Sequence, residues 1–227
     1  MKRKAVLSLL IFVPLLGVAA PESTGSVQGS VVDENGRPVA NVKVYPMGKG
    51  PLTAAPFSIT DDDGNFELRR LLPGETKLFA VATQAGYPDG RSGIFTGDPS
   101  MFETVNIEPG RTLRGVVLKL PKKGGVFRAH IVDIVTGKPV LTSRIRITRA
   151  DVPKVFYESG PNLQGQFEIV LVPNVPFRVE IRAANYKEWQ YARVDSQGKA
   201  NSDLVLSPEA IEEVTVKLQM LPEDQTH

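Results

Sequence analysis

The most constraining feature of the sequence is a pattern that occurs twice, about one hundred residues apart. The stretch "TDDDGNFELRRLLPGE" (60–75) returns as "PNLQGQFEIVLVPNV" (161–175), and "VVDENGRPVANVKVY" (31–45) returns as "IVDIVTGKPVLTSRIRI" (131–147). Both versions of the first stretch keep a glycine and a phenylalanine at matching positions: Gly64 and Gly165, Phe66 and Phe167. This period is too long for a solenoid unit and fits two complete domains. The sequence therefore predicts an internal duplication.

Within each copy the pattern is typical of β-strands. "FRVEIRA" from Phe177 and "EVTVKLQM" from Glu213 alternate apolar with polar residues, which places one strand face on a core and the other in water. "KLFAVATQ" (77–84) is apolar on both faces, as in a strand covered on both sides. Roughly seven short strands per hundred residues, separated by glycine-rich turns, predict an all-β fold of two tandem antiparallel β-sandwich domains.

The first twenty residues predict a secretory signal peptide. "MKRK" is a basic start, an apolar run follows, and "GVAAPES" supplies small residues for cleavage after Ala19 or Ala20. Removal of Lys2, Arg3 and Lys4 from the 27 lysines and arginines leaves 24 against 25 acidic residues. We therefore expect no nucleic-acid partner, because no basic stripe remains to neutralise phosphates. The chain has no cysteine, so its stability must come from core burial.

The predicted organisation follows from these features. "PKKGG" (121–125) has the proline, charge and glycine expected at a domain boundary. The sequence divides into a signal peptide (1–20), a linker (21–26), a first β-sandwich (27–121), a linker (122–125), a second and divergent β-sandwich (126–220) and a tail (221–227). No segment after the leader reaches the roughly 18 apolar residues of a spanning helix, so we expect no membrane span in the mature chain.

The first copy resembles the carboxypeptidase regulatory-like domain, a transthyretin-like (prealbumin-like) β-sandwich. The resemblance is carried by "GSVVDENGRPVANVKVYP" and "ITDDDGNFELRRLLPGETKLFAVATQAGY", across about Val27 to Leu120. The second copy, about Val126 to Met220, keeps "VD", "TGKPV" and "GQF" but lacks the acids of the hairpin. The resemblance implies a non-catalytic accessory fold, common in exported bacterial proteins.

The acidic hairpin permits two interpretations. Asp61, Asp63 and Asn65 supply oxygen atoms at alternating positions, as in a calcium loop. The glycine that such a loop needs at its sixth position is instead Phe66, and the second copy has the same hairpin without the acids. A tight turn in which aspartate caps backbone groups is therefore favoured over a weak calcium site.

No catalytic motif accompanies these patterns. The chain has only two histidines, His130 and His227, and lacks H-E-x-x-H, G-x-S-x-G and G-x-x-x-x-G-K-[ST]. His130 lies on the polar side of a predicted strand, where a solvated residue is favoured over a catalytic base. A carboxylate pair for glycoside cleavage stays open, because only separation in space defines it.

The best candidate for a recognition surface is the loop from Gly86 to Val105. Loops on a rigid scaffold often carry binding, and mixtures of aromatic residues with arginine suit it. The alternative is a loop folded back on the sandwich. Trp189 in the second copy could stack on a sugar, with cross-strand packing as its alternative. The candidate binding residues are Tyr87, Asp89, Arg91, Phe95, Phe102 and Trp189.

The leading hypothesis is an exported, non-catalytic module with a structural or binding role, in the periplasm or outside the cell. We expect no cofactor, and a protein or glycan of the cell envelope as partner. The alternative is a carbohydrate- or peptide-binding protein with a weak calcium-assisted site at the acidic hairpin. A weak hydrolase is the third hypothesis.

Overall fold

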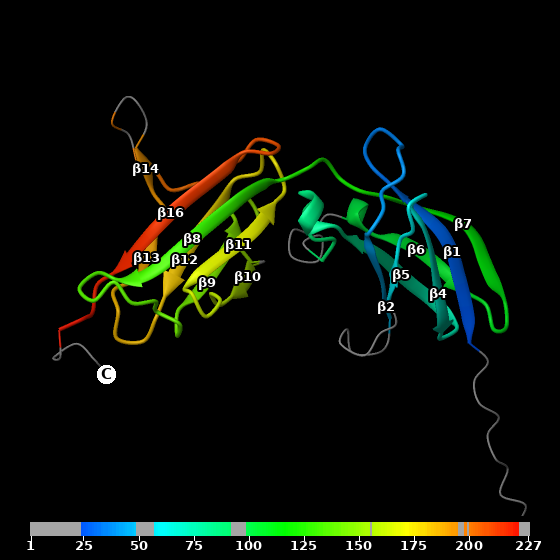
Figure 1. Ribbon diagram of the computed structural model, residues 1–227, viewed down its shortest axis with the longest axis horizontal. Coiled ribbons are helices and arrows are strands. Elements are labelled where there is room, and N and C mark those ends of the chain that lie inside the picture. The colour runs from blue at the N-terminus through cyan, green and yellow to red at the C-terminus, as the bar shows by residue number, and fades with distance from the viewer. Residues whose placement is uncertain are drawn as a thin grey trace, which may run out of the picture.

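The computed structural model describes residues 24–48, 57–91, 99–154, 156–194, 198 and 200–222, and it is almost entirely β-structure (Figure 1). The fold class expected from the alternating pattern is confirmed. The strands are β1 (Gly25–Val32), β2 (Lys43–Met47), β3 (Ser58–Ile59), β4 (Asn65–Leu71), β5 (Gly74–Val81), β6 (Glu103–Ile107), β7 (Thr112–Lys119), β8 (Gly125–Asp133), β9 (Arg144–Arg149), β10 (Phe156–Ser159), β11 (Gln166–Leu171), β12 (Phe177–Arg182), β13 (Trp189–Gln190), β14 (Arg193–Val194), β15 (Ala200–Asn201) and β16 (Ile211–Leu218).

The N-terminal half of the described chain (24–120) is a two-layer sandwich. One sheet has the order β4-β1-β7 and the other β3-β2-β5-β6. The core takes residues from both sheets, among them Val27, Leu68 and Leu118 of the first and Val44 and Leu78 of the second. Because these side chains alternate with polar ones along each strand, each sheet turns one face to the core.

The C-terminal half (125–222) repeats this order of strands. One sheet runs β11-β8-β16 and the other β10-β9-β12-β13, around a separate core that includes Phe127, Ile145, Val179 and Val216. A small hairpin of β14 and β15 projects from this half (Figure 1).

Most strand pairs are antiparallel, as the sequence pattern predicts, and one pair in each half is not. β7 runs parallel to β1, and β16 runs parallel to β8. Each half therefore begins and ends with neighbouring strands that point the same way. No local sequence signal records this pairing, because the paired strands are the first and last of their half and are far apart in sequence.

Strand β5 is covered on both faces, as its apolar run predicts. Leu78 points into the core, whereas Phe79 points to the opposite face and is still only 1% exposed. Tyr45 of β2 stacks on the ring of Phe79 with centroids 5.4 Å apart, and Phe102 meets the same ring edge-on at 6.3 Å. These neighbouring rings shield the Phe79 side chain from water.

The glycine shared by the two hairpins has a structural reason. Gly64 and Gly165 have φ angles of +75° and +77°, a region that residues with a side chain rarely adopt. A Cβ atom would also lie within 2.8 Å of the Val31 carbonyl oxygen at Gly64, and within 2.9 Å of the Ile131 oxygen at Gly165. Each glycine carbonyl accepts a hydrogen bond from the backbone of that same residue, at 2.9 and 2.8 Å, which ties the hairpin to the first strand of its half.

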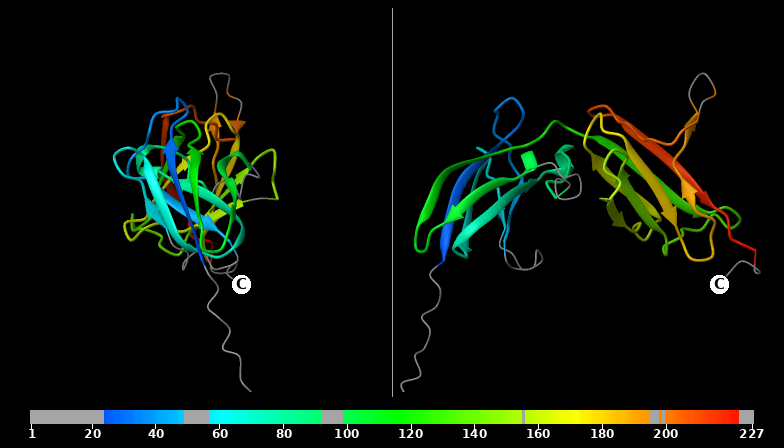
Figure 2. Two further views of the ribbon diagram at one scale, coloured as in Figure 1. Left: turned by 90° about the vertical axis from the view of Figure 1, so that its right-hand side faces the viewer. Right: turned by 180° about the vertical axis from the view of Figure 1, so that it is seen from behind.

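A short segment joins the two halves. The backbone N–H of Gly124 donates to the carbonyl of Gly86 at 2.8 Å, and Lys123 forms an exposed salt bridge of 2.9 Å with Glu209. The halves lie side by side along the long axis of the molecule (Figure 2). In the described part of the chain, no helix has the length and apolar character needed to cross a membrane. The predicted signal peptide (1–20) lies outside the described residues.

Candidate functional site

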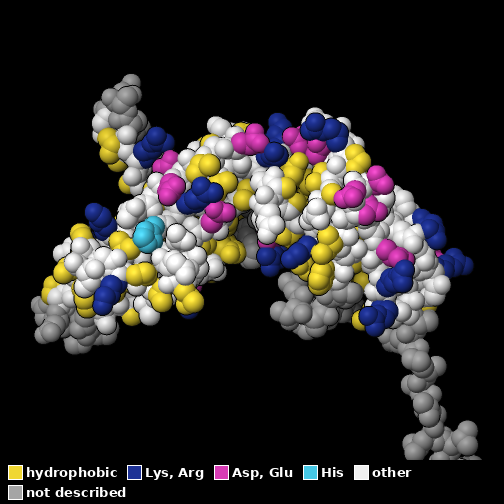
Figure 3. Space-filling model, viewed as in Figure 1, with side chains coloured by type: hydrophobic (Ala, Val, Ile, Leu, Met, Phe, Trp, Pro, Cys, Tyr) yellow, Lys and Arg dark blue, Asp and Glu magenta, His cyan; other side chains and the backbone are white. Residues whose placement is uncertain are grey.

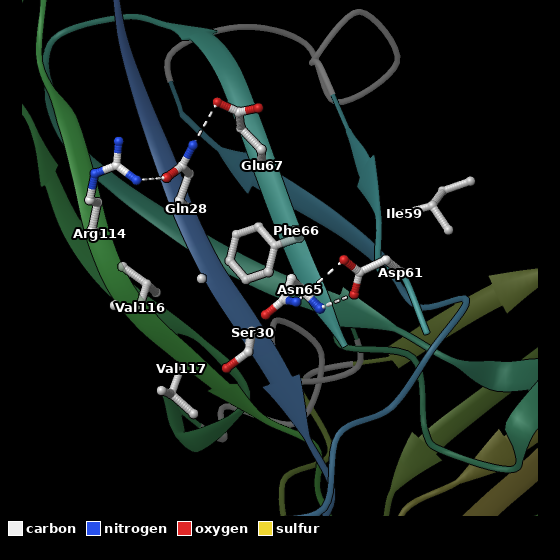
Figure 4. A pocket seen from close by; sticks show the side chains of 12 residues that line it. Gln28, Ser30, Ile59, Asp61, Asn65, Phe66, Glu67, Arg114, Val116 and Val117 are labelled. Atoms are coloured by element: carbon white, nitrogen blue, oxygen red, sulfur yellow. Dashed lines mark hydrogen bonds between the residues drawn. The ribbon is translucent and has the colours of Figure 1, made fainter. Parts of the chain in front are cut away.

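A groove lies on the outer face of the sheet β4-β1-β7 (Figure 4). It has a volume of about 630 Å³. Its floor exists because β1 and β4 alternate, so that the residues between their core positions point outward. The side chains that line it are Gln28, Ser30, Ile59, Asp61, Asn65, Phe66, Glu67, Arg114, Val116 and Val117.

A chain of hydrogen bonds crosses the three strands along the groove. Arg114 of β7 donates to the Gln28 side-chain oxygen on β1, and the Gln28 amide nitrogen donates to Glu67 of β4 at 3.0 Å. Arg69 donates to the other oxygen of Glu67 at 2.5 Å. The bond from Arg69, followed by that from Gln28, lowers the pKa of Glu67 below its ordinary value. Glu67 is therefore an ionised acceptor at neutral pH and no proton donor.

Asp61 at the other side of the groove is engaged by its own turn. Its Oδ1 accepts the backbone N–H of Asn65 at 2.7 Å and of Asp63 at 3.1 Å, and its Oδ2 accepts the Asn65 side-chain amide at 3.3 Å. These bonds, led by the backbone bond from Asn65, lower the pKa of the Asp61 carboxyl. The side chain thus stabilises the hairpin, as aspartate does in turns.

The C-terminal half builds the same turn without a charge. Asn162 occupies the position of Asp61, and its side-chain oxygen accepts the backbone N–H groups of Gln164 at 3.0 Å and Gln166 at 2.9 Å. An amide oxygen therefore serves the turn as well as a carboxylate does. The negative charge at Asp61 is not needed for the shape of the hairpin.

The predicted calcium ligands are close together, but their oxygen atoms do not form a cage. Among the described residues, no group of three or more His, Cys, Asp or Glu side chains is placed to hold a metal ion. Asp61 already directs both oxygens at the turn, with Asn65 as one of its donors. Calcium binding at Asp61, Asp63 and Asn65 stays a prediction.

The predicted recognition loop divides between the core and the surface. Tyr87 is 5% exposed and belongs to the N-terminal core, and its burial raises the pKa of its hydroxyl. Asp89 and Arg91 remain at the surface as a bidentate ion pair, with a shortest N–O distance of 2.6 Å. The hydrogen bonds that the Arg91 guanidinium donates to Asp89 raise the pKa of Arg91.

Phe102 and Trp189 are not among the residues that line the groove. Phe102 packs edge-on against Phe79, with Lys77 Nζ 5.8 Å from its ring centroid, and it lines a small hollow of about 90 Å³. Trp189 is half-buried against the C-terminal core, with its ring edge-on to Tyr191 at 6.4 Å. Phe95 lies outside the described residues.

The groove joins Asp61 and Asn65 to residues that the sequence analysis did not select. Gln28, Glu67 and Arg114 are polar residues at outward positions of three strands that are distant in sequence. The only sequence signal for these residues was their polar position in the apolar–polar alternation of the strands. Every solvated strand residue shares this signal, so it could not single them out. His130 is exposed on β8, as the strand pattern predicts.

The fold and the groove define a class: all-β proteins whose sandwich presents a polar, solvent-facing sheet. The sequence profile of the carboxypeptidase regulatory-like domain matches residues 26–117. The resemblance read from the sequence is thereby confirmed for the first copy. No curated protein matches the chain.

Solved structures give distant similarities. The chain aligns with the Bacillus anthracis TIE protein at 16% identity and a TM-score of 0.35, over 88% of this chain and 34% of that one. It thus spans about a third of that protein. The shaft pilin SpaA from Lactobacillus rhamnosus GG aligns at 10% identity and a TM-score of 0.35, over 88% and 99% of the two chains. A leucine-rich repeat protein from Bacteroides thetaiotaomicron aligns at 15% identity and a TM-score of 0.34, over 88% of this chain and 27% of that one. Likeness at this level carries no functional conclusion.

Proposed function

We propose that this protein is an exported, non-catalytic pair of β-sandwich domains that acts as a structural or binding module, in the cell envelope or outside the cell. The leader pattern supports export, and the carboxypeptidase regulatory-like segment supports an accessory role. The repeated strand orders β4-β1-β7 and β11-β8-β16, each with its own core, support two tandem domains divided near Pro121–Gly125.

The protonation state of the carboxyl groups in the groove supports the non-catalytic part of the proposal. General acid catalysis by a carboxyl group needs a raised pKa, so that the proton is present at the working pH. The two carboxyl groups that line the groove, Asp61 and Glu67, both have lowered pKa values because of the hydrogen bonds they accept. Two ionised carboxylates with occupied oxygens supply neither the acid nor a free base for hydrolysis.

The test is a search for turnover by the chain that begins at Pro21. Purified protein is incubated with peptide, ester and glycoside substrates, alongside an Asp61→Asn/Glu67→Gln variant from the same preparation. We expect no turnover above the variant for any substrate. Turnover by the wild type that the variant loses would make the groove an active site and end the proposal.

A glycan- or peptide-binding groove is the second candidate, and its lining favours it. Gln28, Ser30 and Asn65 offer both donors and acceptors beside the apolar Ile59 and Val117. Such a mixture suits sugar hydroxyls or an extended backbone. Binding to glycan and peptide arrays by wild type and by Gln28→Ala tests it, with Gln190→Ala of the C-terminal half as the matched control. Equal binding by all three proteins would remove the groove from the function.

Calcium is tested separately by titration calorimetry of the wild type and of Asp61→Asn/Asp63→Asn. Because Asn162 serves the same turn, the variant keeps its hairpin and loses only charge. Heat and a melting shift in the wild type alone would support a calcium-assisted site. The absence of both would leave the acids as parts of the turn.

A further inference from the structure

Exposed apolar side chains gather at the end of the C-terminal half that lies farthest from the N-terminal half. The turn after β8, the turn before β11 and the end of β16 meet there, and Ile134 N–H donates to the Leu218 carbonyl at 2.9 Å. Figure 3 shows hydrophobic side chains at the surface of this end. We call this set the distal patch: Ile134, Val135, Leu141, Leu163 and Met220.

The two most prominent members stand at the tips of neighbouring turns. Val135 is 86% exposed and Leu163 is 81% exposed. The turns touch because the backbone of Gly165 lies against Pro139, and the Gly165 carbonyl accepts the Ile131 N–H. The aliphatic side chains at these tips therefore project into solvent.

The fold does not require apolar residues at these tips. In the N-terminal half, Asn35 takes the place of Val135, and in both turns the backbone N–H of this residue donates to an aspartate Oδ1, at 2.8 Å in Asp33 and 3.0 Å in Asp133. Asp62 likewise stands where Leu163 does in the matching hairpin. The same backbone is thus built with polar tips in one half and with apolar tips in the other. Apolar tips exposed together indicate a contact that removes them from water.

Among the described residues, two unpaired lysines lie in the turns that carry the patch or beside them. Lys138 follows Val135 in the same turn, and Lys187 is joined to the end of β16 by its N–H bond to the Gln219 carbonyl at 2.8 Å. Both are exposed, and neither makes a salt bridge with a described residue. The acids beside them are engaged: Asp133 is buried and accepts bonds from its turn and from Tyr186, and Glu188 is paired with Arg182 at 2.9 Å.

We propose that the distal patch is a peripheral docking surface for an anionic lipid bilayer. Projecting aliphatic tips enter the boundary between headgroups and acyl chains, while the lysines behind them contact anionic headgroups. Projecting apolar tips need no complementary pocket on a bilayer, whereas a protein partner would have to supply one. The N-terminal half has Glu34 and Asp62 in the equivalent turns, and the same headgroups repel these acids.

Co-sedimentation with vesicles tests the proposal. The chain from residue 21 onward is used, because the apolar leader would itself enter lipid. Vesicles of phosphatidylglycerol with phosphatidylethanolamine are compared with vesicles of phosphatidylcholine alone. We expect binding to the anionic vesicles, a decrease with salt, and about tenfold or greater loss in Val135→Asp/Leu163→Asp, given the transfer free energy of large aliphatic side chains.

The matched control is Asn35→Asp/Leu72→Asp, which adds the same charge and also removes an exposed leucine, on the N-terminal half. We expect it to bind as the wild type does, and all variants are checked for unchanged melting. Equal binding by both double variants, or no sedimentation of the wild type at any lipid concentration, would overturn the proposal. Size-exclusion chromatography supplies a further arm: a dimer that Val135→Asp/Leu163→Asp abolishes would assign the patch to a second copy of the chain instead.

Discussion

Two aspartates hold equivalent turns, and both are poised to respond to acid. Asp33 accepts the backbone N–H groups of Asn35 and Arg37 at 2.8 and 2.9 Å, and Asp133 accepts those of Val135 and Thr136 at 3.0 and 2.7 Å. The backbone bond from Arg37 is the main cause that lowers the pKa of Asp33, and that from Thr136 does so for Asp133.

These shifts predict that the protein loses stability in acid. A carboxyl whose folded pKa lies below the unfolded 3.8 stabilises the fold above that pH, and this contribution is lost as the pH falls through the folded value. We expect the melting temperature of the wild type to fall between about pH 5 and pH 2 more steeply than that of Asp33→Asn/Asp133→Asn. Scanning calorimetry of both proteins across this pH range measures the melting temperatures. Parallel plots of melting temperature against pH would contradict the prediction.

The two shared phenylalanines predict equal roles in two cores. Phe66 is 4% exposed and Phe167 is 7% exposed, each within the core of its own half. We expect Phe66→Ala and Phe167→Ala each to lower the free energy of unfolding by about 3–5 kcal/mol, the range for a buried aromatic residue. Phe57→Ala is the control, because that ring is exposed. Chemical denaturation measures the loss, and values under about 1 kcal/mol for both core variants would contradict core burial.

At the scale of the element, the acidic hairpin separates shape from charge. We expect Asp61→Asn to leave stability unchanged, because Asn162 already forms the same bonds. We expect Asp61→Ala to lower the free energy of unfolding, through the lost acceptor of two backbone N–H groups. Asp62→Ala is the control, since leucine stands there in the other half. Denaturation curves decide, and a loss in Asp61→Asn as large as in Asp61→Ala would show that the charge itself matters.

Elements could be predicted from the sequence where the residue pattern is local. Alternation predicted the strands, and the double-sided apolar run predicted the burial of Phe79. The groove could not be predicted in the same way. Gln28, Glu67 and Arg114 meet only because β1 pairs with β4 and, in parallel, with β7, and no local pattern states this pairing. The sequence also gave no sign that Tyr87 turns inward while Asp89 and Arg91 stay at the surface.

At the scale of the whole molecule, the two proposed domains predict independent folding. The cores are separate, and among the described residues Gly124 bonds to Gly86 and Lys123 forms an exposed salt bridge with Glu209, which contributes little. We expect the fragments 21–121 and 122–222 each to unfold in one cooperative transition. Scanning calorimetry of the fragments and of the chain measures this. A fragment without a transition, or a chain far more stable than either fragment, would argue for one merged unit.

The parallel pairing of β1 with β7 and of β8 with β16 has a mechanical consequence. The chain enters each half at one pole and leaves it at the other, so a pull on the two ends drives paired strands past each other lengthwise. The hydrogen bonds between the paired strands are then loaded together in shear, instead of breaking one after another from one end. A domain with this pairing resists force along its strands more strongly than force applied across them.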